Sequence, residues 1–161
     1  VTRPSGAAVR TDIETLLRET GQRTLTVIDF SNVGLLDFSC ADEIVAKLLL
    51  RETGDGVPEG YFVFRGILDH HLDAIEHVLE RHRLAAVAEE PGAEPRLVGI
   101  VAESEDAVWR ALRRRGPASA DELATETGLA VEEARAVLDG LCRRKLVMRV
   151  EDTYLAVGGI Q

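Results

Sequence analysis

The chain has 161 residues, 45% of them hydrophobic, which is enough for one large domain or two small domains with a real core. Its formal net charge of -9 excludes a general electrostatic attraction to nucleic acid or to an anionic membrane. Any contact with nucleic acid must therefore use a local basic patch. Cys40 and Cys142 lie far apart and match no metal-binding spacing, so we expect them to be reduced thiols.

The first half of the chain alternates helical and strand patterns. Apolar residues at helical spacing predict a helix over residues 7–19. The β-branched run from Leu25 to Phe30 then predicts a buried strand. Ser39 is expected to open the next helix, whose apolar face comprises Ile44, Val45, Leu48 and Leu49.

Residues 53–60 are rich in glycine and carboxylates and indicate a surface loop. The elements that follow are expected to be a strand at 61–65, a helix at 68–79, and strands at 84–88 and 97–101. This alternation predicts an α/β layer with a partly parallel sheet. We assign it to a first domain, residues 1–102.

The pattern changes in residues 103–161, which we assign to a second domain. Ser104 is the expected N-cap of a helix that stops at Gly116. Ser119 and Glu122 form a capping box that begins a second helix. A third helix is expected over 131–144, followed by strands at 146–150 and 154–157. Three helices and a hairpin are the order of elements in a winged helix.

Residues Val27 to Ile44 resemble the uncharacterised STAS-like domains that carry a D-F-x-x-V stretch followed by A-D-E. The matching residues here are Asp29, Phe30, Val33, Ala41, Asp42 and Glu43. The resemblance implies that a protein partner docks on the loop and helix after the first strand. The expected docking residues are Asp37, Ser39, Asp42 and Glu43.

A more distant resemblance is to the anti-sigma-factor antagonists, which are phosphorylated on a serine that follows an aspartate at the start of this helix. In this chain Asp37 is followed by Phe38, and Ser39 comes one position later. Ser39 is therefore either a phosphorylation site or simply the helix N-cap, and both interpretations stay open.

The last sixty residues resemble a bacterial winged helix-turn-helix domain. The matching core comprises Leu123, Ala124, Gly128, Leu129, Ala134, Leu138, Leu141, Leu146 and Val147. Two positions depart from the pattern: Ala130 replaces a capping Ser or Thr, and Lys145 replaces a helix-ending Gly. The resemblance implies a DNA contact through Ser119, Val131, Glu132, Arg135 and Arg149.

The charges of this region favour an alternative. Glu132 and Glu133 begin the expected recognition helix, and Glu151 and Asp152 occupy the turn of the hairpin. These carboxylates would repel DNA phosphates, so the winged helix could instead be a protein-interaction or assembly module. The two basic clusters, 113–115 and 143–145, lie at helix C-termini, where the helix dipole favours cations.

Four carboxylates after the first strand, those of Asp29, Asp37, Asp42 and Glu43, could bind a hard cation. Acids are favoured in a first helical turn in any case, and no nucleophile, base and oxyanion hole occur together. We therefore expect no metal, no cofactor and no enzymatic activity. The histidines between His70 and His82 are expected to lie on a solvated helix face.

The sequence contains no secretory signal and no apolar run of membrane-spanning length. It therefore predicts a cytoplasmic location, and the two resemblances together imply a non-enzymatic bacterial regulator. The first domain would bind a regulatory protein, and the second would bind double-stranded DNA. A regulator that reads DNA is expected to be a homodimer.

Overall fold

The computed structural model describes residues 24–46 and 60–158. Four strands, β1 (Thr24–Asp29), β2 (Gly60–Arg65), β3 (Ala85–Glu89) and β4 (Arg96–Gly99), form one sheet in the order β1-β2-β3-β4. The first three strands are parallel, and β4 pairs antiparallel with β3. The expected mixed sheet is thus confirmed. The expected helix over 7–19, most of the loop over 53–60, and Leu48 and Leu49 lie outside the described residues.

The helix after β1 begins earlier than expected. It consists of α2 (Phe38–Ala41), which continues into a π-helical turn, η1 (Asp42–Ala46). Its N-cap is Asp37, whose carboxylate accepts a hydrogen bond from the Cys40 amide at 2.7 Å. The expectation that Ser39 is the N-cap is therefore wrong. Because the helix begins at Phe38, the capping position falls on Asp37, whose carboxylate also faces the positive end of the helix dipole.

Another helix described in the first half, α4, spans Asp69–His82. The second half contains α5 (Glu103–Arg115), α6 (Ala120–Thr127) and α7 (Val131–Arg143), then β5 (Val147–Val150) and β6 (Thr153–Ala156). The last two strands form an antiparallel hairpin. Three helices followed by a hairpin are thus observed in the expected order.

The start of α5 also differs from the expectation. Its N-cap is Ala102, and Ser104 lies inside the first turn. The Ala102 amide donates to the Glu105 carboxylate at 3.0 Å. Glu105 therefore satisfies from within the helix an amide that lies just outside it, and no capping hydroxyl is needed.

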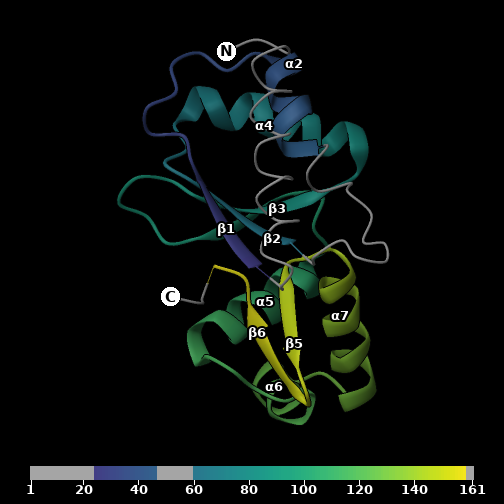
Figure 1. The fold of residues 1–161 in the computed structure, drawn as a ribbon. Helices are drawn as coiled ribbons and strands as arrows, with labels where there is room; N and C mark the ends of the chain where they lie inside the picture. The colour runs from purple at the N-terminus through teal and green to yellow at the C-terminus, as the bar shows by residue number, and fades with distance from the viewer. Residues whose placement is uncertain (1–23, 47–59, 159–161) are drawn as a thin grey trace.

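The sheet is covered on both faces (Figure 1), with α2 and α4 on one side and the C-terminal elements on the other. Successive residues of β2 point to opposite faces: Phe62 and Phe64 pack in the cluster with α4, whereas Tyr61 and Val63 pack in the cluster with Trp109. At the sheet edge, Val27 of β1 is 41% exposed, so the expectation of a buried strand is wrong at this position.

The two halves of the chain share one of these clusters. Trp109 of α5 is 1% exposed, and its Nε1 donates to the carbonyl of Leu146 at 3.1 Å. Arg144 donates to Glu105 at 3.0 Å and to the Ile100 carbonyl at 2.5 Å. The cluster thus crosses the boundary expected between residues 102 and 103, and the division into two domains stays a prediction.

Candidate functional site

A hollow of about 310 Å³ lies between the start of α6, the exposed face of α7 and the β5–β6 hairpin. It is lined by Ser119, Ala120, Asp121, Arg135, Arg149, Asp152 and Tyr154. Three of the five residues expected to contact DNA, Ser119, Arg135 and Arg149, therefore lie together although they belong to three different elements. Val131 and Glu132 are exposed at the start of α7 but do not line the hollow.

The amphipathic pattern of α7 explains why Arg135 faces outward. Ala134, Leu138 and Leu141 are buried against the core, and these positions follow the helical repeat. Arg135, one position after Ala134, lies on the exposed side of the helix. Within the described part of the chain its guanidinium makes no hydrogen bond or ion pair. Its five N–H groups are therefore available to an incoming acceptor.

Ser119 is engaged in the capping box that the sequence predicts. Its hydroxyl accepts from the Glu122 amide at 3.3 Å and donates to the Glu122 carboxylate at 3.1 Å. The Ser119 amide also donates to this carboxylate, and together with Arg115 it lowers the pKa of Glu122. A ligand at Ser119 would therefore have to exchange hydrogen bonds with the cap.

Arg149 is held against the hairpin. Its guanidinium lies 5.6 Å from the centre of the Tyr154 ring, and its Nε donates to the Glu151 carbonyl at 2.9 Å. Tyr154 in turn donates to Asp139 at 3.2 Å, and burial raises the pKa of the Tyr154 hydroxyl. Arg149 is thus positioned at one wall of the hollow by an aromatic ring that is itself anchored to α7.

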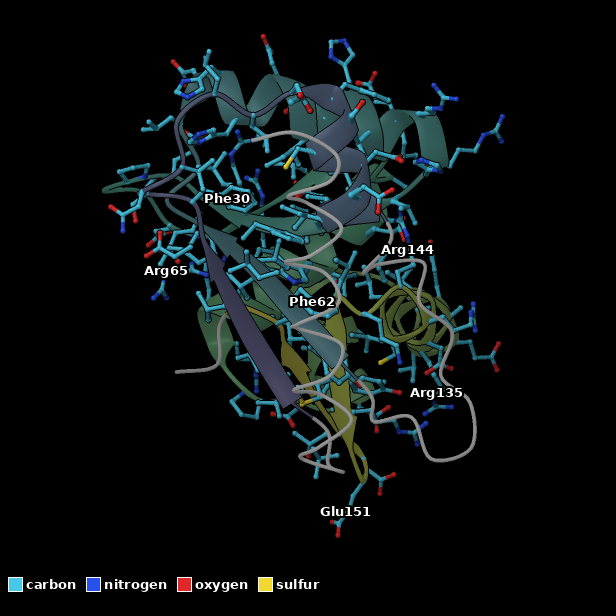
Figure 2. All side chains as sticks on the ribbon, turned by 45° about the horizontal axis from the view of Figure 1, so that its top comes forward. Phe30, Phe62, Arg65, Arg135, Arg144 and Glu151 are labelled. Carbon is cyan, nitrogen blue, oxygen red and sulfur yellow. The ribbon has the colours of Figure 1, made fainter. Side chains whose placement is uncertain are left out.

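The rim of the hollow is acidic. Asp121 and Asp152 line it, and Glu132, Glu133 and Glu151 are exposed nearby. Figure 2 shows Glu151 at the tip of the hairpin and Arg135 on α7. The two arginines are thus outnumbered by carboxylates, which opposes the approach of a phosphate backbone.

The two basic clusters of the sequence do not line this hollow. Arg115 pairs with Glu122 at 2.5 Å and with Glu126 at 3.3 Å, while Arg144 pairs with Glu105. Arg113 and Arg114 line a separate cleft on α5. Most of these cationic side chains therefore form ion pairs or lie away from the hollow.

The four residues expected to dock a protein partner differ in exposure. Asp37 is exposed and Ser39 is half-buried, so both can be reached from solvent. Asp42 accepts from Nε2 of His82 at 2.8 Å and Glu43 is only 6% exposed, so both pack toward the interior. Next to Asp37, Leu35 is 81% and Phe38 is 38% exposed.

The loop after β1 is fixed by a histidine that we expected on the surface. His71 is fully buried; its Nδ1 accepts from the Leu68 amide at 3.2 Å and its Nε2 donates to the Gly34 carbonyl at 2.8 Å. Its spacing from Ile75 and Val78, four and seven residues on, places it on the buried stripe of α4. That spacing could have identified it from the sequence.

Residues 24–46 and 60–158 contain neither a metal-binding cluster nor a membrane-spanning helix. These residues contain no group of three or more His, Cys, Asp and Glu side chains able to hold a metal ion. No helix among them is both long and apolar enough to cross a membrane. No protein-family model matches the chain, and no curated protein sequence is significantly similar to it.

Proposed function

We propose that the chain is a non-enzymatic, cytoplasmic bacterial regulator in which a STAS-like domain is followed by a winged helix that binds DNA. The observation that carries the proposal is the hollow in which Ser119, Arg135 and Arg149 come together. An unpaired arginine on a helix and an arginine held on the adjoining hairpin suit two phosphate groups of one duplex. As a homodimer, the regulator would present this arrangement twice.

The first half would receive the signal. The exposed Leu35 and Phe38, beside Asp37 and the accessible Ser39, provide an apolar patch with a polar rim, which suits a protein partner. Occupancy of this patch would change what the winged helix binds, provided that the partner discriminates between two states of the chain.

A second candidate function is protein assembly through the winged helix without DNA. The acidic rim of the hollow favours this alternative, because Glu132, Glu133, Glu151 and Asp152 would suit a basic protein surface better than a phosphate backbone. The two functions are separated by whether the full chain binds duplex DNA.

The first experiment measures binding of the full chain to a labelled random-sequence duplex and to duplexes from upstream of its own operon. Arg135→Ala is expected to weaken binding by about tenfold, because it removes a phosphate contact that has no competing partner. Arg65→Ala is the matched control: it removes an arginine whose side chain is 47% exposed at the end of β2. Equal effects of both variants would contradict the proposed interface, and absence of binding would favour the assembly function.

A further inference from the structure

A second cleft, separate from the hollow described above, lies between α5 and the turn that joins β3 to β4. It has a volume of about 330 Å³ and is lined by Glu94, Pro95, Arg96, Trp109, Arg110, Arg113 and Arg114. Four of these seven residues are arginines and one is a glutamate. Such a concentration of positive charge is unusual in a chain whose net charge is -9.

Arg113, in the wall of this cleft, has a side chain whose hydrogen-bond donors are not all used. The Nε of Arg113 is buried and has no hydrogen-bond partner among residues 24–46 and 60–158. Its Nη1 pairs with Glu94 at 3.3 Å, and the Glu94 side chain is 84% exposed. A buried donor without an acceptor is costly, whereas an ion pair with so exposed a carboxylate contributes little. An anion in the cleft can therefore replace Glu94 at Nη1; to accept from Nε as well, it must displace the atoms that now bury Nε.

The other three arginines of the cleft add positive charge around Arg113. Arg110, Arg113 and Arg114 are spaced three and four residues apart on α5, so they lie on one face of the helix. Arg110 pairs with Asp106 at 2.9 Å and Arg96 with Glu90 at 2.8 Å, both at the surface. Among the residues that the structure describes, Arg114 has no ion-pair partner. The C-terminal end of α5 favours cations but does not require three of them on one face.

We propose that this cleft binds a phosphate group, either free or carried by a small molecule. A tetrahedral phosphate has enough oxygens to accept from the Nε and Nη atoms of Arg113 and from Arg114 together, as planar guanidinium groups allow. The cleft is of the size of small-ligand sites, and Pro95 and the buried Trp109 also line it. This site does not depend on whether the winged helix binds DNA.

The test uses the fluorescence of Trp109, the only tryptophan of the chain. The full chain is titrated with inorganic phosphate and, separately, with glycerol phosphate, at constant ionic strength and about pH 7.5, where the phosphate carries close to two charges. We expect a saturable change with a half-point on the order of 1 mM or below. A response that does not saturate, or that sodium chloride reproduces, would overturn the proposal. Saturation by either phosphate supports it and shows whether the free or the esterified group binds better.

Three variants locate the site. Arg114→Gln, at an exposed position, is expected to raise the dissociation constant about tenfold by removing charge-assisted hydrogen bonds. Arg113→Lys keeps the charge but removes the Nε donor, and should also weaken binding. Arg143→Gln is the matched control, because it removes an exposed arginine from the last turn of α7, outside the cleft. Wild-type affinity in both cleft variants with a native circular dichroism spectrum would contradict the assignment.

Discussion

Trp109 connects the sheet of the first half to the hairpin of the second. Its side chain packs in the cluster that contains Tyr61, Val63 and Val87, and its Nε1 donates to Leu146 immediately before β5. The Leu146 carbonyl accepts a second hydrogen bond, from the Val157 amide at 3.0 Å. Trp109 therefore contributes both buried area and a fixed point for the hairpin.

Trp109→Phe is expected to lower the free energy of unfolding by about 2 kcal/mol, from a smaller ring in a close-packed cluster and one lost hydrogen bond. The measurement is urea unfolding followed by far-ultraviolet circular dichroism. Tyr154→Phe is the control, because it removes one donor, to Asp139, without leaving a cavity, and should cost about 1 kcal/mol or less. Equal stability of Trp109→Phe and the wild type would contradict this role.

At the scale of single residues, the sequence predicts the contacts between residues that are close together in the chain. The capping box of Ser119 with Glu122 is confirmed because both partners lie within one turn. Contacts such as those of His82 with Asp42 and of Arg144 with Glu105 join residues that are far apart in sequence, and no local pattern contains them. For the same reason, the choice of Asp37 over Ser39 as N-cap depends on where the chain leaves β1.

The helix α7 carries the charges that decide what the hollow can bind. Its first turn presents Glu132 and Glu133, and Arg135 follows on the exposed side. The carboxylates stabilise the helix because they face the positive end of its dipole, but they also repel phosphate groups. The sequence of α7 thus combines a stabilising feature of the helix with a cost for DNA binding.

If α7 faces DNA, the double variant Glu132→Gln with Glu133→Gln is expected to raise the affinity for duplex DNA several-fold, since it removes two repulsive charges. The measurement is a binding titration at fixed low salt. Glu103→Gln is the control, because it removes the same kind of first-turn carboxylate from α5. An unchanged affinity in the double variant would show that the start of α7 does not approach the DNA.

At the scale of elements, periodicity predicts most of the described structure. The strands at 61–65 and 84–88 and the helices over 68–79 and 131–144 are found within a few residues of their expected bounds. The π-helical turn at Asp42–Ala46 and the exposed edge position of Val27 were not foreseen. Both depend on which segments pack nearby, and a pattern of apolar residues does not specify this.

In the whole molecule, elements of the expected signal-receiving half cover one face of the sheet, and elements of the expected output half cover the other face. A partner bound near Asp37 and a ligand bound in the arginine-lined cleft would therefore act on opposite sides of a shared sheet. The sequence indicated that Arg135 and Arg149 belong to one surface, through a resemblance. It did not indicate the second cleft, because Arg96 and residues 110–114 come together only through the packing of α5 beside the β3–β4 turn.

The most direct test of the regulator function is the salt dependence of duplex binding by the wild-type chain. Because the net charge is -9, any binding must come from the local arginines and not from a general attraction. With two arginines per chain in a dimer, the account predicts binding at about 50 mM salt that weakens about 100-fold at about 200 mM. No binding at the lower salt concentration would contradict the DNA-binding function and leave protein assembly as the role of the C-terminal half.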